Sequence, residues 1–325
     1  MMDAETAELL AQSLERAFRN AAVKAVEAAL DEVGWREALD EEGAAVVPLL
    51  FARQGEANAA SGALDDVLTS ALGLQAGPGT AFVLPEFGGY APPGSVRDGD
   101  LAVRGLGSAR MAVADRAVVL AEQPDGALSA VVVDTGEVEV RPVGGVDPRL
   151  GLSAVGGRDV SAAGGTLVTP AAWDAALAVG RVALAHELIG ASRTMLRLAR
   201  EHALTRVQFG KPIGAFQAVR HRLAECLVAI ESAEAAATAA IGAAGEVSPL
   251  LAGMAKAVAG RNARTVARHC QQVLAGVGFT DEHDFHRCFR RVLTLDGLLG
   301  DARTLTRALG EELLRERRLP AAPPL

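Results

Sequence analysis

Residues 205–225 read TRVQFGKPIGAFQAVRHRLAE, and they interrupt a region that otherwise has the pattern of continuous helix. Gly210 readily adopts turn conformations and Pro212 lacks a backbone donor, so a helix that reaches this point has to end. The helical pattern then resumes at once. Arg206 and Gln208 flank the break, where alanine would form helix more readily. The turn therefore separates two long helices, and its polar residues need an explanation other than helix formation.

Apolar residues at helical spacing dominate the chain on both sides of this turn. Pro170 suits the first turn of a long helix, and Gly276 and Gly278 suit the end of a later one. The expected helices cover about 170–206, 214–244, 249–276 and 285–318. Four long helices with short connections predict an antiparallel four-helix bundle over residues 167–325.

The first half of the chain divides into two further zones. Residues 1–75 have the apolar spacing of helices. Residues 76–166 are rich in Gly and Pro, with short β-branched runs between them, which predicts a small β-domain. The fold class expected is α+β and mostly α: an N-terminal helical segment, a middle β-domain and a C-terminal bundle.

The composition excludes several classes of function. A net charge of −8 and a pI near 5.4 argue against binding to nucleic acid or to an anionic membrane. The N-terminus has no secretory pattern, and no stretch suggests a membrane span of about 18 apolar residues, so we expect a cytoplasmic protein. The three cysteines lack metal-site spacing and are expected to be buried thiols, and the histidines indicate no metal site.

Two motifs in the C-terminal half resemble the acyl-CoA dehydrogenase family, which also has this order of domains. Residues 185–225 (AHELIGASRTMLRLAREHALTRVQFGKPIGAFQAVRHRLAE) are similar to the family's helix, RxQFG turn and following helix. Residues 270–291 (CQQVLAGVGFTDEHDFHRCFRR) are similar to its second signature, in which a Gln and a glycine-rich turn precede an Arg pair. The likeness is clear over about 170–300, loose in the β-domain and poor before it.

The resemblance implies FAD as cofactor, held between two subunits, with the RxQFG turn of one subunit reaching the diphosphate and adenosine of the flavin on its neighbour. An arginine fork and the amides of a helix N-terminus are chemically suited to a diphosphate. One residue departs mildly from the pattern, because Ala275 replaces the first glycine of the usual pair. The residues implied as FAD contacts are Arg206, Gln208, Phe209, Gln272, Gly276 and Gly278.

The resemblance also implies removal of two hydrogens from an acyl-CoA thioester, with a glutamate as the base that takes the α proton. Asp296 stands at one of the two family positions for that glutamate, and Gly180 stands at the other. Aspartate is one methylene shorter, so Asp296 is only a weak catalytic candidate. Glu187 lies about two turns along the helix from Gly180, which allows the same face but a different place.

The β-domain lacks the family's flavin-ring contacts. Residues 81–93 (AFVLPEFGGYAPP) keep a Pro-Glu pair but no hydroxyl at the expected position, and residues 106–117 (LGSARMAVADRA) have no tryptophan. The resemblance therefore implies a half-site: the cross-subunit part of the flavin site is kept, while the ring pocket is degraded.

Three hypotheses remain open. The first is a subunit of a heteromeric, α2β2 acyl-CoA dehydrogenase whose homologous partner brings the ring pocket and the base; such enzymes are known among actinobacteria that degrade steroids as CoA thioesters. It implies an acyl-CoA substrate, with steroid-derived acyl groups among the candidates, and an electron-transfer flavoprotein as acceptor. The second is a homo-oligomeric dehydrogenase that uses Asp296. The third is a flavin-free scaffold that keeps the bundle only for assembly.

Overall fold

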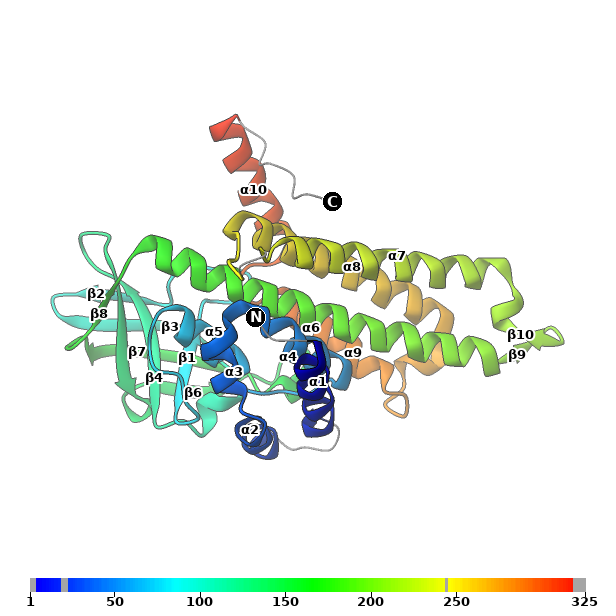
Figure 1. Ribbon diagram of the computed structural model, residues 1–325, viewed down its shortest axis with the longest axis horizontal. Coiled ribbons are helices and arrows are strands. Elements are labelled where there is room, and N and C mark those ends of the chain that lie inside the picture. The colour runs from blue at the N-terminus through cyan, green and yellow to red at the C-terminus, as the bar shows by residue number, and fades with distance from the viewer. Residues whose placement is uncertain (1–3, 19–22, 243–244, 318–325) are drawn as a thin grey trace.

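The structure is a computed structural model that describes residues 4–18, 23–242 and 245–317, and it has the expected order of helices, sheet and bundle (Figure 1). Helices α1–α5 precede the sheet and pack beside the bundle. Their bounds are α1 Ala4–Phe18, α2 Val23–Glu32, α3 Trp35–Glu42, α4 Val47–Ala57 and α5 Ala63–Ala71.

The middle part is one sheet of eight strands in the order β6-β7-β3-β1-β4-β5-β8, with β2 paired to both β3 and β4. Alternate residues of β1 face opposite sides, as the two-residue period of a strand requires. Phe82 packs toward the helices and stacks on Trp173, while Ala81 and Val83 belong to the core on the other face. The bounds are β1 Thr80–Leu84, β2 Gly94–Arg97, β3 Asp100–Gly107, β4 Arg116–Glu122, β5 Leu128–Asp134, β6 Glu139–Pro142, β7 Ser153–Ser161 and β8 Thr166–Val168.

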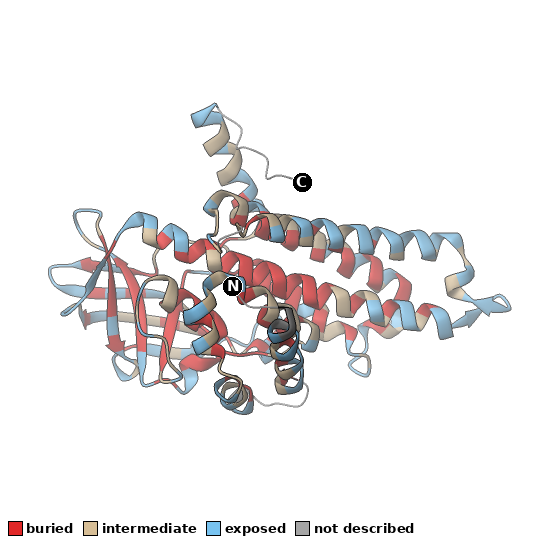
Figure 2. Ribbon diagram, viewed as in Figure 1, coloured by how far each residue is buried: buried red, intermediate tan, exposed pale blue. Residues whose placement is uncertain are grey.

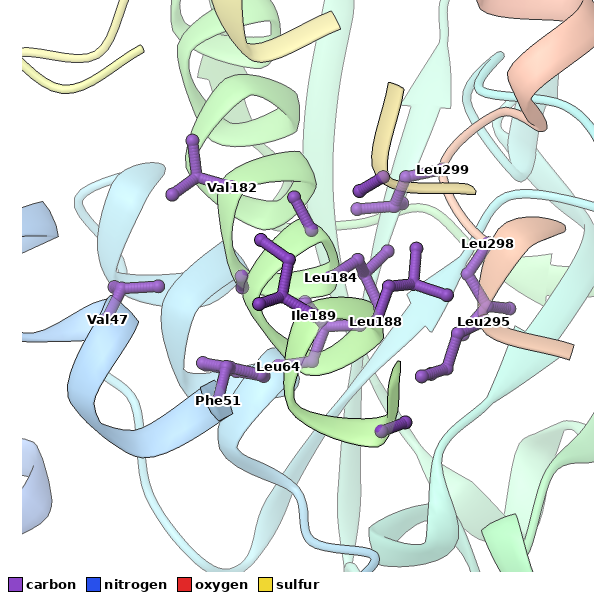
Figure 3. Packing of buried hydrophobic residues seen from close by; sticks show 14 of the residues in the cluster. Val47, Phe51, Leu64, Val182, Leu184, Leu188, Ile189, Leu295, Leu298 and Leu299 are labelled. Atoms are coloured by element: carbon purple, nitrogen blue, oxygen red, sulfur yellow. The ribbon is translucent and has the colours of Figure 1, made fainter. Parts of the chain in front are cut away.

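Helix α6 (Pro170–Thr205) runs through the centre of the bundle beside α7 (Gln217–Ala239), α8 (Pro249–Leu274) and α9 (Phe285–Asp296). It begins as expected, with Pro170 in its first turn and the Thr169 hydroxyl accepting a hydrogen bond from the Ala172 N–H. Its middle is buried on all sides (Figure 2), and side chains from α4, α5 and α9 meet it there (Figure 3).

By length and composition alone, helix α6 is long and apolar enough to cross a membrane. The expectation that the chain contains no such stretch was therefore wrong by these two criteria. Its apolar 18-residue window has a mean hydropathy of 1.2, and 89% of that window is buried inside the protein. The apolar character of α6 is therefore accounted for by its place in the bundle core.

The single fourth helix predicted over 285–318 is wrong, because α9 ends at Asp296 and α10 (Ala302–Glu316) begins after a five-residue turn. Leu299 and Gly300 in that turn have φ of 53° and 96°. Buried Lys256 donates hydrogen bonds to the carbonyls of Asp296 (2.9 Å) and Gly300 (3.3 Å), which holds the turn in place. Helix α10 then leaves the body of the protein (Figure 1).

Two fully buried arginines join parts that are far apart in sequence. Arg110, after β3, donates to Asp66 of α5 (2.5 Å) and Glu27 of α2 (2.8 Å). Burying a guanidinium without such partners would cost several kcal/mol, roughly, so this pairing fixes the N-terminal helices against the sheet. The second such arginine, Arg291 of α9, is described with the site.

Candidate functional site: the end of the bundle and the turn after α9

The break at residues 206–212 is a tight hairpin. Strand β9 (Val207–Gln208) pairs with β10 (Lys211–Pro212), and the two residues between them, Phe209 and Gly210, have φ of 53° and 78°. Two consecutive positive φ angles are typical of a type I′ turn, a conformation that glycine adopts easily and phenylalanine does not. The hairpin projects beyond the end of the bundle (Figure 1).

The hairpin presents an aromatic ring and cations to solvent. Phe209 is 91% exposed, although it makes an edge-to-face contact with Phe216, 6.1 Å between ring centroids. Lys211 places its Nζ 4.5 Å from the centre of the Phe216 ring. Exposed Arg206 has no ion-pair partner among the residues that the structure describes, and exposed Gln208 donates only to the carbonyl of its neighbour. These groups do little for the stability of the chain, so they are available to a ligand.

The second motif forms a turn, η6 (Ala275–Phe279), at the end of α8. The helix was expected to end on Gly276 and Gly278, but the residue with positive φ (52°) is Ala275, where the family pattern has a glycine. Gly278 is needed for packing, because a Cβ there would lie 2.6 Å from the Gln271 side chain, whereas a Cβ on Gly276 would meet open space. Gln272 is exposed beside this turn.

The structure brings the two motifs to the same end of the bundle. Arg222, near the start of α7, lies 3.0 Å from the His269 ring in the last turns of α8. Burial and then the charges of His283 and Arg206 lower the pKa of His202, so the last turn of α6 lies near the residues that follow η6. The six residues implied as FAD contacts therefore lie at the same end of the bundle, on or beside two turns.

Asp296 is buried and already paired. Its Oδ2 accepts hydrogen bonds from Arg264 Nε (2.8 Å) and Nη2 (2.7 Å), and its Oδ1 accepts from the Ala302 N–H at the start of α10 (3.2 Å). The carboxylate faces α8, since a Cβ on Gly260 would lie 2.0 Å from Oδ1. A general base has to reach the proton that it removes, and this carboxylate points at an arginine instead.

The loop between β1 and β2 covers the turn after α9. A Cβ on Gly297 would lie 2.1 Å from the Phe87 ring, and the Gly88 N–H donates to the Gly297 carbonyl at 2.7 Å. The Tyr90 ring lies over the Arg181 guanidinium, 4.9 Å from centroid to Cζ. The β1–β2 loop, which the resemblance assigns to the flavin-ring pocket, therefore packs on the segment of the same chain that follows Asp296.

The second family position for the base is also filled. A Cβ on Gly180 would meet the Leu299 side chain at 2.7 Å and the Leu68 side chain at 3.0 Å. Buried Arg181 donates through Nε to the Leu299 carbonyl at 3.1 Å, and burial lowers its pKa. No carboxylate could be placed at Gly180 without moving this packing.

Glu187 is a buried structural acid. Its carboxylate accepts from Gln54 (2.9 Å) and from Arg291 (3.3 Å), which also binds Asp147 (2.6 Å) and the Ala59 carbonyl. Burial raises the pKa of Glu187, and the Arg291 charge opposes that shift. Arg291 is fully buried while the adjacent Arg290 is exposed, and no signal in the sequence separates the two.

Comparison with known proteins agrees with these motifs. Residues 171–314 match the model of the acyl-CoA dehydrogenase C-terminal domain. Acyl-CoA dehydrogenase IpdE2 of Mycobacterium tuberculosis is 39% identical over 132 residues, 41% of each chain. The chain spans only 24% to 42% of the length of the curated relatives that it matches.

Solved structures share the fold over nearly the whole chain. A chain of the ChsE4-ChsE5 complex from M. tuberculosis aligns with a TM-score of 0.79 and 21% identity, covering 98% of this chain and 99% of that one. A chain of the Tcur3481-Tcur3483 steroid ACAD G363A variant aligns with a TM-score of 0.77 and 22% identity, covering 96% and 99%. Residues 171–314 of this chain are therefore similar in sequence to the acyl-CoA dehydrogenase C-terminal domain, and the solved structures share the fold of nearly the whole chain.

Proposed function

We propose that this chain is one subunit of a heteromeric, FAD-dependent acyl-CoA dehydrogenase, paired as α2β2 with a homologous subunit. One observation carries the proposal. The hairpin end of the bundle presents exposed groups without partners among the described residues, while Asp296 is paired with Arg264 and Gly180 is packed against Leu299. The chain would thus complete a flavin site on its partner and lack a complete site of its own.

The residues at the hairpin fit the diphosphate and adenosine end of FAD. Arg206, which has no ion-pair partner in the described part of the chain, offers a planar fork for a diphosphate. Gln208 adds a donor, and the exposed Phe209 ring offers an apolar face for the adenine side. Gln272 and the turn of Gly276 and Gly278 would complete the contact. When bound, FAD supplies the acceptor for the hydride that leaves the acyl-CoA.

The chain's own residues would bind and orient this cofactor, and the partner would supply the ring pocket and the base. Two of the related structures are complexes of two differently named chains, and one of them is named a steroid ACAD. This supports a homologous partner and a steroid-derived acyl-CoA as substrate. An electron-transfer flavoprotein as acceptor and a cytoplasmic location complete the proposal.

Two alternatives make different demands on the same residues. A homo-oligomeric dehydrogenase would need Asp296 as its base, but that carboxylate is engaged by Arg264. A flavin-free scaffold would have no use for an exposed phenylalanine at positive φ beside an exposed arginine. Both observations favour the heteromeric subunit.

Co-expression with a homologous dehydrogenase subunit tests the proposal. We expect the two chains to copurify in equal amounts and to oxidise an acyl-CoA with an artificial electron acceptor, with neither chain active alone. Turnover by this chain without a partner would instead favour the homo-oligomeric enzyme.

A further inference from the structure

Helix α10 rises from the body of the protein beside α8 (Figure 1), and residues of α8, α10 and the turn before α10 line a groove at this junction. It contains a cavity of about 590 Å³, a size typical of sites for small organic ligands. The residues that line it are Arg261, Arg264, Asp296, Asp301, Ala302, Arg303, Thr306 and Arg307.

Positive charge dominates this groove, although the chain as a whole carries a net charge of −8. Both aspartates are already used: Asp296 pairs with Arg264, and Asp301 caps α10 by accepting a hydrogen bond from the Thr304 N–H at 2.7 Å. Within the described ranges, the side chains of Arg261 and Arg303 have no ion-pair or hydrogen-bond partner.

Arg261 and Arg303 line the same cavity, and no carboxylate among the described residues pairs with either, so both remain available to a bound anion. Arginine presents its donors as a planar fork that matches phosphate oxygens. The cavity is larger than a single phosphate ion needs. We propose that the groove binds a phosphate-bearing small molecule of nucleotide size, with Arg261 and Arg303 as the anion contacts.

This site is separate from the hairpin end of the bundle. Arg264 precedes Gln272 by eight residues, which corresponds to about 12 Å along α8 at 1.5 Å per residue. The proposal does not depend on the heteromeric function, because it rests on a different set of residues and a different cavity.

Isothermal titration of the purified protein, as the full chain alone where it is soluble and otherwise as the flavin-loaded complex with its partner, tests the proposal. The probes are inorganic pyrophosphate, ADP and coenzyme A, at constant ionic strength in chloride buffer. We expect one site with a dissociation constant below about 1 mM. The double variant Arg261→Ala/Arg303→Ala should bind at least about tenfold more weakly, because two charge-assisted contacts are lost. The matched control is Arg97→Ala/Arg158→Ala, which removes two exposed arginines of the sheet and should bind within about twofold of the parent.

The three probes distinguish the source of the phosphate. Equal affinity for pyrophosphate and ADP means that the anion alone is recognised, whereas tighter binding of ADP or coenzyme A identifies a nucleotide. Absence of binding by all three probes would overturn the proposal, and so would an equal loss in the control variant. Loss of binding in Arg206→Ala would place the anion at the hairpin and would also overturn it.

Discussion

Arg206 is the residue on which the proposed cofactor contact depends most. Its guanidinium is exposed and unpaired among the described residues, so its removal should not weaken the fold. In the Arg206→Ala complex we expect FAD affinity to fall about ten- to a hundredfold, since a hydrogen bond to a charged group contributes about 1.5–3 kcal/mol. Fluorescence titration of the flavin-free complex measures this affinity.

The control for Arg206 is Arg158→Ala, which removes an exposed arginine of β7. It should keep the parent's flavin affinity, and both variants should assemble with the partner. Unchanged flavin affinity in Arg206→Ala would mean that this arginine serves only as a cation at the C-terminal end of α6.

Asp296 is predicted to be structural. Asp296→Asn should leave turnover of the complex within a few-fold of the parent, and it should lower the free energy of unfolding by about 1–2 kcal/mol because Arg264 loses its charged acceptor. Loss of a general base would instead slow turnover by about 10²- to 10⁴-fold. Steady-state assays at full flavin occupancy separate the two outcomes.

Arg264→Met provides the matched control for this pair. If the pair is structural, Arg264→Met and Asp296→Asn should have similar effects on stability, and the double variant should cost less than their sum. A hundredfold loss of turnover confined to Asp296→Asn would make Asp296 the catalytic base.

His186 should make the protein sensitive to acid. Burial lowers its pKa to about 4, and its Nε2 has no hydrogen-bond partner among the residues that the structure describes. A histidine in the unfolded chain titrates near 6.5. The folded state therefore favours the neutral ring. Its contribution to stability is complete above about pH 6.5, and it is lost progressively as the pH falls from there to about 4.

Urea unfolding between pH 7.5 and pH 4.5, as rough limits, measures this loss, which should amount to about 2.5 kcal/mol for His186 at about 1.4 kcal/mol per pH unit. His186→Leu should flatten the decline by that amount, while His221→Leu, at an exposed position on α7, should leave it unchanged. An equally steep decline in His186→Leu would mean that other groups cause it.

At the scale of elements, two glycines set how closely α4 and α6 approach. A Cβ on Gly190 would lie 2.1 Å from the Ala52 carbonyl oxygen, and a Cβ on Gly55 would lie 2.1 Å from the Glu187 carbonyl oxygen. Since these contacts are with backbone atoms, no side chain can move away to relieve them. Gly190→Ala should therefore lower the free energy of unfolding by about 3 kcal/mol.

Gly253→Ala, in α8, is the matched control for Gly190→Ala. Its Cβ would meet only the Arg181 guanidinium, at 3.9 Å, so it should be neutral or stabilise the helix by up to about 1 kcal/mol. Chemical unfolding of both variants tests the idea, and a Gly190→Ala protein as stable as the parent would contradict it.

Helical periodicity predicts α6, α7 and α8 to within a few residues at most ends, because each buries an apolar face between strong stop signals. It fails at the turn after α9, where Leu298 and Leu299 continue the apolar pattern although Leu299 has a positive φ. It also cannot tell buried Arg291 from exposed Arg290, because their difference arises from Asp147 and Glu187, which are distant in sequence.

At the scale of the whole molecule, the contrast between two regions matters most: the hairpin end of the bundle is exposed, whereas the surroundings of Asp296 and Gly180 are closely packed. The motifs predicted from sequence lie together at the hairpin end, because motif residues adjacent in sequence form local turns. The packing of Phe87 on Gly297, of Tyr90 on Arg181 and of Leu299 on Gly180 could not be predicted, because it depends on how distant segments of the chain meet at the bundle. The only indication of this packing in the sequence was the loss of the family's flavin-ring contacts in residues 81–93 and 106–117.

The number of flavins per chain tests the split site most directly. Because a half-site offers diphosphate contacts without a ring pocket, we expect the isolated chain to be colourless or insoluble. The complex with its homologous partner should contain one FAD per heterodimer, two in an α2β2 assembly, as measured by absorbance of released flavin against protein mass. One FAD per chain in the isolated protein, or two per heterodimer in the complex, would contradict the account.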